Sequence, residues 1–191
     1  DAFGYHPIGP SRVAFYLLDV AGHGVASALH SVSVLSALQH ERLPGVDFGD
    51  PAAVLSALNL AFPRERGGFY FTIWYGVVDL AAHTIRFASG GHPPPVLVGP
   101  AGRRELDLTG PMIGIVTDVV YEVGEARYEP GEQLFVFSDG AYELIQADGT
   151  MLGEYDIPTP NSGARCITAM ADGRFFFTQW DAGLIGEVIP G

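Results

Sequence analysis

The chain has 191 residues, 48% of them hydrophobic and 17% charged, which is the composition of a globular protein and not of a disordered one. Ten basic and twenty-two acidic residues give a formal net charge of −12, which argues against nucleic-acid binding and is compatible with divalent metals or a basic partner. Cys166 is the single cysteine and there is no run of about 18 apolar residues, which excludes an internal disulfide and a membrane-spanning helix. We therefore expect a cytoplasmic protein of one domain, or of one domain and a fragment, with neither nucleic acid nor a membrane as partner.

The N-terminal third predicts one buried strand followed by two helices. Residues 13–20 form a continuous apolar run that ends in an acid, as in a strand buried on both faces. After a Gly-rich turn at 21–24, apolar residues at helical spacing predict a helix that packs on a sheet. The apolar stripe of this helix is expected to be Val25, Ala28, Leu29, Val32 and Leu35, with Ser27 and Ser31 on the other face. A second helix is expected to have Asp50 as its N-cap and Pro51 as its first residue, and to end at Pro63.

Strands dominate the rest of the chain. The expected strands cover residues 68–80, 84–89, 96–98, 120–127 and 133–137, with turns rich in Gly and Pro between them. Two helices together with this many strands predict the α+β class, as a layered sandwich.

The composition changes near Asp148, where a stretch rich in Pro, Gly and Ser begins. Beyond it, strands are expected at residues 166–170, 174–180 and 185–189, joined by tight turns into a small antiparallel meander. We therefore divide the chain into residues 1–153 and residues 154–191.

Three acids are candidates for metal binding. Asp19 and Asp139 each end a strand beside a glycine-containing turn, and Asp1 stands at the start of the chain. Strand-end carboxylates beside glycine can converge on a hard divalent cation, although each could instead cap a turn. His23 is a candidate general acid or metal ligand, or else a turn residue, and His92 is expected to have a structural role.

Eight short motifs in a fixed order resemble a known family. They are Asp-Ala-Phe-Gly (1–4), Asp-Val-Ala-Gly-His-Gly (19–24), Leu-Asn (58–59), Phe-Thr-Ile-Trp-Tyr-Gly-Val (71–77), Ser-Gly-Gly-His-Pro-Pro (89–94), Pro-Met-Ile-Gly (111–114), Glu-Pro-Gly-Glu (129–132) and Phe-Ser-Asp-Gly (137–140). From residue 1 to about residue 154 the chain is similar to the SpoIIE-type bacterial serine phosphatases, a branch of the metal-dependent PPM phosphatases.

The resemblance implies a β-sandwich flanked by helices, with two Mn²⁺ or Mg²⁺ ions at one end. Asp1, Asp19, the backbone carbonyl of Val20 and Asp139 would match metal ligands of the family. A metal-activated water would then hydrolyse phosphoserine or phosphothreonine without a protein nucleophile. The usual substrates are phosphorylated regulatory proteins, the anti-sigma-factor antagonists, and a sensory or response-regulator module often precedes the domain.

The sequence also departs from the family pattern. Gly4 stands where the family often has a second acid, and nothing after Asp139 matches the terminal Asp-Asp-x-Thr motif, which predicts a truncated sandwich and a weakened metal site. Two other functions therefore stay open: a binding module that holds metal poorly, and a fragment of a propeller lyase.

Residues 154–191 resemble one blade of a virginiamycin B lyase-type β-propeller. Arg165 and Gln179 replace the His and Glu that some lyase blades carry, so no lyase residue is assigned. One blade cannot close a ring, and we expect it to lie against an exposed edge or face of the sandwich.

Overall fold

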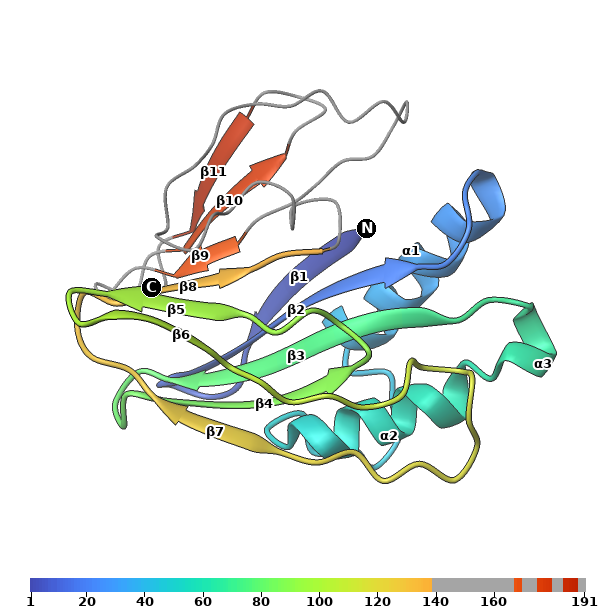
Figure 1. Cartoon of the computed structure of the whole chain (residues 1–191). Helices are drawn as coiled ribbons and strands as arrows, with labels where there is room; N and C mark the ends of the chain where they lie inside the picture. Colours follow the sequence, from blue (N-terminus) through green and yellow to red (C-terminus); the bar gives the residue numbers. More distant parts are fainter. Residues whose placement is uncertain (139–166, 170–174, 180–183, 189–191) are drawn as a thin grey trace.

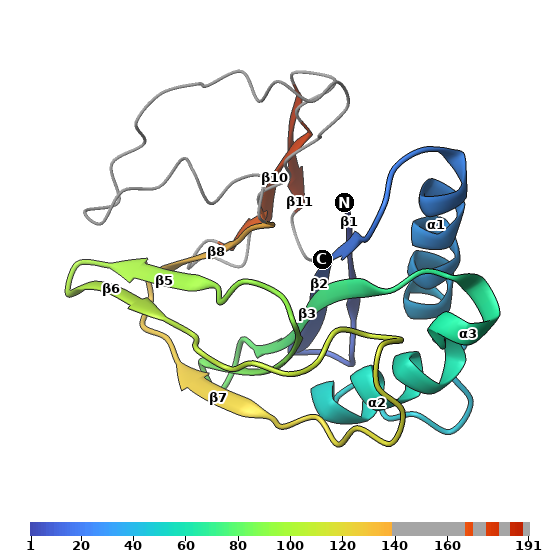
Figure 2. The ribbon, with the colours of Figure 1, turned by 45° about the vertical axis from the view of Figure 1, so that its right-hand side comes forward.

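The computed structural model of the chain describes residues 1–138, 167–169, 175–179 and 184–188. Two antiparallel sheets pack face to face, and the helices cover the outer face of the first sheet (Figures 1 and 2). The first sheet has the order β1-β2-β3-β4-β7 and the second has the order β11-β10-β9-β8-β5-β6. The fold is therefore the α+β sandwich that the sequence predicts.

The described elements follow one another along the chain in this order: β1 (Ala2–Pro7), β2 (Arg12–Val20), α1 (Val25–Gln39), α2 (Pro51–Ala61), α3 (Arg64–Gly67), β3 (Phe71–Asp79), β4 (Thr84–Gly90), β5 (Val96–Gly99), β6 (Gly102–Glu105), β7 (Gly124–Arg127), β8 (Gln133–Val136), β9 (Ile167–Ala169), β10 (Phe175–Gln179) and β11 (Leu184–Val188). Three elements, β1, α3 and β6, were not predicted from the sequence. It also made β7 too long, because Val120 is 89% exposed and Tyr121 is buried outside the sheet, where its hydroxyl donates to the Pro111 carbonyl.

Two cores lie on either side of the first sheet, and β2 supplies both. Tyr16 and Leu18 pack toward the helices, whereas Phe15 and Leu17 pack between the sheets. This alternation is the two-residue period of a strand with both faces covered, as the apolar run at residues 13–20 predicts. It also fixes which residues of β2 face the interior of the sandwich.

The outward face of α1 differs from the prediction. Val25, Leu29 and Val32 of the expected apolar stripe are 77%, 62% and 60% exposed, while Val34 and Leu38 are fully buried against the sheet. Apolar residues occur on more than one face of this helix, so their spacing alone does not identify the buried face. The prediction of the helix was correct. The prediction of its core-facing stripe was wrong except for Leu35, which is partly buried against the core.

The start of α2 is confirmed. Asp50 is its N-cap, with carboxylate Oδ1 accepting from the backbone N–H groups of Ala52 and Ala53, and Pro51 is the first helical residue. The helix then buries Val54, Leu55 and Leu58 against the first sheet. These signals lie within one turn, which is why the sequence predicts them well.

The C-terminal strands form the expected antiparallel meander. β9 pairs with β10 and β10 with β11, and β9 also pairs with β8, so that Phe135 lies opposite Thr168. The expectation that this meander lies against an edge of the sandwich is confirmed, because its three strands extend the second sheet. The division between residues 153 and 154 stays a prediction, and Cys166, Arg165 and Asp148 lie outside the described residues.

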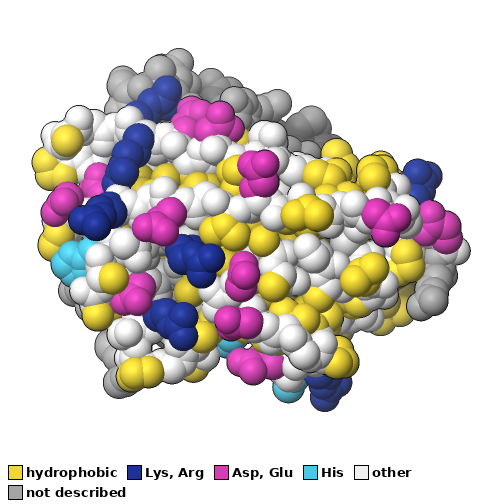
Figure 3. All heavy atoms as spheres, turned by 90° about the horizontal axis from the view of Figure 1, so that it is seen from below, with side chains coloured by type: hydrophobic (Ala, Val, Ile, Leu, Met, Phe, Trp, Pro, Cys, Tyr) yellow, Lys and Arg dark blue, Asp and Glu magenta, His cyan; other side chains and the backbone are white. Residues whose placement is uncertain are grey.

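The surface carries charge of both signs. On the face seen in Figure 3, arginine side chains lie in a row along one side with acidic side chains between and beside them.

Within the described residues, no helix is long and apolar enough to span a membrane.

Candidate metal-binding end of the sandwich

The structure brings Asp1 and Asp19 together. β1 and β2 are antiparallel with Ala2 opposite Leu18, and one further step of this register places Asp1 opposite Asp19. The backbone nitrogen of Asp1 lies 3.7 Å from carboxylate Oδ1 of Asp19. Both residues are thus at the same end of the first sheet (Figure 1).

Both carboxylates belong to the inner face of this sheet. Phe3 packs with the core between the sheets, so the two-residue period puts Asp1 on the same side. Phe15 and Leu17 establish the same side for Asp19. The side chain of Asp19 is 33% exposed, which leaves it partly accessible at the open end of the sandwich.

The Val20 carbonyl points toward the same end. In the pairing of β2 with β3, Asp19 lies opposite Thr72 and Val20 lies opposite Phe71. The backbone N–H and carbonyl of Phe71 point away from β2, because they form hydrogen bonds of 3.2 and 2.9 Å with Ile113. Alternate residues of a strand direct their backbone groups to opposite neighbours, so the Val20 carbonyl faces the β1 side of β2, where Asp1 lies. Two carboxylates and one carbonyl are hard oxygen donors, which fit Mg²⁺ or Mn²⁺.

The part of the chain that the structure describes does not place the other two predicted site residues, His23 and Asp139, in this group. His23 is exposed in the turn between β2 and α1, between the positive-φ glycines Gly22 and Gly24. Asp139 follows β8 and lies outside the described residues. Among the described residues, no three acidic, histidine or cysteine side chains lie close enough together to hold a metal ion. The metal-ligand assignment of Asp1, Asp19, Val20 and Asp139 is therefore a proposal.

Thr72 and His92 extend the row of polar side chains across the sheet. Thr72 is opposite Asp19, and Trp74, two residues further along β3, packs in the core between the sheets, which puts Thr72 on the inner face as well. Thr72 Oγ1 lies 2.9 Å from His92 Nδ1, and His92 is only 3% exposed. The sequence predicts a structural role for His92 but gives no signal for Thr72, because the contact between them joins segments 20 residues apart.

A rigid turn places His92. Ser89 Oγ donates to the His92 carbonyl and accepts from the His92 N–H, both at 3.2 Å. Gly91 has φ +70°, and a Cβ there would lie 2.6 Å from Cγ of Met112. The turn after β4 therefore needs glycine both for its left-handed backbone and for the close approach of Met112.

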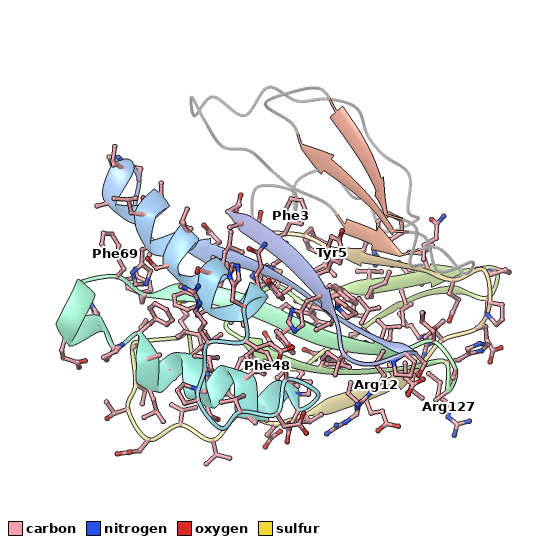
Figure 4. The ribbon with its side chains drawn as sticks, turned by 180° about the vertical axis from the view of Figure 1, so that it is seen from behind. Phe3, Tyr5, Arg12, Phe48, Phe69 and Arg127 are labelled. Atoms are coloured by element: carbon pink, nitrogen blue, oxygen red, sulfur yellow. The ribbon has the colours of Figure 1, made fainter. Side chains whose placement is uncertain are left out.

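The opposite end of the sandwich carries basic side chains. Figure 4 shows Arg12 and Arg127 together at that end, away from Phe69 and from the start of α1. Arg12 begins β2, whereas Asp19 is near the end of the same strand. The candidate metal ligands and this arginine pair are thus separated by the length of β2.

The fold and the family match define the class of protein. The two-sheet sandwich with helices on one outer face is the fold of the PP2C phosphatase domain of SpoIIE from Bacillus subtilis, which superimposes with a TM-score of 0.65 at 19% identity, over 75% of this chain and 42% of that chain. The chain matches the family described as Stage II sporulation protein E (SpoIIE) over residues 9–159, and it belongs to that family.

Two curated relatives come from Bacillus subtilis (strain 168). Phosphoserine phosphatase RsbP is 29% identical over 149 residues, covering 75% of this chain and 36% of RsbP. Phosphoserine phosphatase RsbU is 26% identical over 136 residues, covering 70% of this chain and 40% of RsbU. The chain therefore spans well under half the length of these relatives. The comparisons give no support to the propeller resemblance of residues 154–191.

Proposed function

We propose that the chain is the phosphatase domain of a metal-dependent enzyme that hydrolyses phosphoserine or phosphothreonine on a regulatory protein. The observation that carries this proposal is the convergence of Asp1 and Asp19 on the inner face at the open end of a PP2C-like sandwich. Two adjacent carboxylates repel each other when ionised, so a site that keeps them together gains from a bound cation.

Four residues would hold the metal. Asp1, Asp19 and Asp139 would supply carboxylate oxygens and Val20 its backbone carbonyl, for two Mn²⁺ or Mg²⁺ ions. Bound ions of this kind supply an activated water for attack on phosphorus. His23 is exposed in the turn after Asp19, and in this proposal it would donate a proton to the serine or threonine oxygen that leaves.

The substrate and partner proposals rest on the relatives. RsbP and RsbU are phosphoserine phosphatases, which favours a phosphoserine substrate. The family resemblance of the sequence further suggests a phosphorylated protein of the anti-sigma-factor antagonist type. Because the chain matches only 36% and 40% of these proteins, we also propose a sensory or response-regulator module on the N-terminal side.

Thermal unfolding with and without Mn²⁺ tests the proposal. Ions that bind only the folded state should stabilise the wild type by about 2.7 kcal/mol at a concentration of 100 Kd. Asp19→Asn and Asp139→Asn should each abolish this shift and the hydrolysis of an aryl phosphate or a phosphoserine peptide. Without metal, Asp19→Asn should unfold at the same temperature as the wild type or slightly above it, because one like charge is removed.

Asp79→Asn is the matched control. Asp79 ends β3 at the other end of the sheet, and its Oδ1 accepts from the N–H groups of Ala81 and Ala82 in a turn. This variant should keep the full Mn²⁺ shift. If the wild type shows no shift at millimolar Mn²⁺, the chain is a binding module that holds metal poorly, and the phosphatase proposal is wrong.

A further inference from the structure

We infer that Thr72 is a positioning residue for the Asp19 carboxylate, and that His92 holds the Thr72 hydroxyl in place for this task. The inference rests on the proposed function, because it gives Asp19 a second layer of support at the metal-binding end.

The strand register places Thr72 beside Asp19. Asp19 and Thr72 are directly opposite in the antiparallel pair of β2 and β3, and both face the interior of the sandwich. Directly opposed residues on one face have Cβ atoms about 4.5–5.5 Å apart. Thr72 is therefore the neighbour of Asp19 on the β3 side, as Asp1 is its neighbour on the β1 side.

The Thr72 hydroxyl can hydrogen-bond to His92 and to a carboxylate at the same time. A threonine hydroxyl can accept from one group and donate to another, whereas a carboxylate only accepts. When His92 carries its proton on Nδ1, the ring donates to Thr72 Oγ1 across 2.9 Å and the hydroxyl proton is left to donate to a carboxylate. A carboxylate ligand that accepts such a bond is held in one rotamer, which strengthens metal binding.

The turn that contains His92 is rigid. His92 is 3% exposed, its backbone is tied to Ser89 in both directions, and Gly91 forms a bridge with Ile73 next to Thr72. A site residue is held accurately when its supporting groups are themselves fixed by packing and hydrogen bonds. The glycine pair before His92 thus serves to bring a fixed imidazole beside the start of β3.

Two pairs of variants of the full chain test the inference. Thr72→Val removes the hydroxyl at similar volume and Thr72→Ser retains it. His92→Leu removes the ring nitrogens, whereas His92→Asn retains a polar group near the Nδ1 position. Thr84→Val is the matched control, because Thr84 is a half-buried threonine of the same sheet, opposite Asp79 at the far end.

The first readout is Mn²⁺ affinity, measured by titrating the unfolding temperature and independently by the electron paramagnetic resonance of free Mn²⁺. Removing an outer-shell partner typically weakens metal binding by about 10–100-fold, which is the loss expected for Thr72→Val and His92→Leu. Thr72→Ser, His92→Asn and Thr84→Val should stay close to the wild type. In aryl phosphate hydrolysis, Thr72→Val should lower kcat and leave KM unchanged.

The outcomes separate this inference from the proposed function. If the wild type binds Mn²⁺ and Thr72→Val binds it equally well, Thr72 does not position Asp19, and the phosphatase proposal stands. If the wild type itself does not respond to Mn²⁺, both are overturned. Should Thr72→Val fail to fold, the His92→Leu and His92→Asn pair decides, since equal Mn²⁺ affinity in these two variants contradicts the inference.

Discussion

Asn59 of α2 accepts a hydrogen bond of 2.8 Å from the backbone N–H of Gly114, 55 residues further along the chain. The amide group of the same side chain donates to the Val116 carbonyl, also at 2.8 Å, and Asn59 is 6% exposed. One buried side chain thus satisfies two backbone groups of the loop after Pro111. Because Ile113 of this loop pairs with Phe71, Asn59 connects the helical layer to the start of β3.

Asn59→Ala should destabilise the fold. It leaves a buried N–H and a carbonyl without their partner, at about 1–3 kcal/mol for each such group, so we expect a loss of about 2–6 kcal/mol in urea unfolding. Leu60→Ala is the control, since Leu60 is the next residue on the helix and is 75% exposed. A loss below about 0.5 kcal/mol for Asn59→Ala, the range of ordinary surface substitutions, would contradict this role.

Two leucines of α1 test which face of the helix is buried. Leu38 is fully buried and Leu29 is 62% exposed, so the same substitution has different costs at the two positions. Leu38→Ala should lower the free energy of unfolding by about 2–5 kcal/mol through lost burial and a cavity. Leu29→Ala should change it by no more than about 0.5 kcal/mol. The opposite order would restore the stripe that the sequence predicts.

Local signals explain which parts of the fold the sequence predicts. The Asp50–Pro51 start of α2 and the buried run of β2 need only neighbouring residues to be recognised. The buried face of α1 could not be predicted in this way. Leu29 and Leu38 are both compatible with an apolar stripe, and only the docking of the helix on the sheet distinguishes them.

The candidate site also combines residues that have a local sequence signal with contacts that have none. The sequence identifies Asp19 because it ends an apolar strand before a Gly-rich turn. Asp1 has no such local signal, and the family resemblance supports it as a candidate. That Asp1 lies beside Asp19 depends on the register of β1, a strand that the sequence analysis did not predict. The contact between Thr72 and His92 depends on the pairing of β3 with β4 and on the turn after β4. Such long-range pairings have no local signature.

Burial of His6 makes the stability depend on pH. His6 is 7% exposed among Tyr16, Phe48 and Tyr75, and burial lowers its pKa from the ordinary 6.5, with Glu41 partly opposing this shift. The unfolded chain therefore binds the proton more readily than the folded protein. Stability is highest above the unfolded pKa, and it is lost as the pH falls below about 6.5 toward the lower folded pKa.

His6→Phe keeps a ring in this cluster and removes the titration. Its urea unfolding free energy should fall less than that of the wild type between about pH 8 and pH 5, while dependence from other groups, including the half-buried His30, remains in both proteins. His40→Gln, an exposed position at the end of α1, should follow the wild type. Equal pH dependence of wild type and His6→Phe would show that His6 does not contribute.

Gly91 and Gly9 separate backbone strain from side-chain crowding. Their φ angles are similar, +70° and +80°, but a Cβ at Gly91 would lie 2.6 Å from Met112 Cγ, whereas one at Gly9 would meet nothing within 4 Å. Gly9→Ala should cost about 1–2 kcal/mol, the penalty of a left-handed conformation for an L-residue. Gly91→Ala should cost about 1–3 kcal/mol more, because the added methyl group overpacks the contact with Met112. In a double-mutant cycle, Met112→Ala should recover most of this extra cost and leave the strain. Equal losses for Gly91→Ala and Gly9→Ala in urea unfolding would show that Met112 yields freely, and that the turn before His92 is less rigid than the structure indicates.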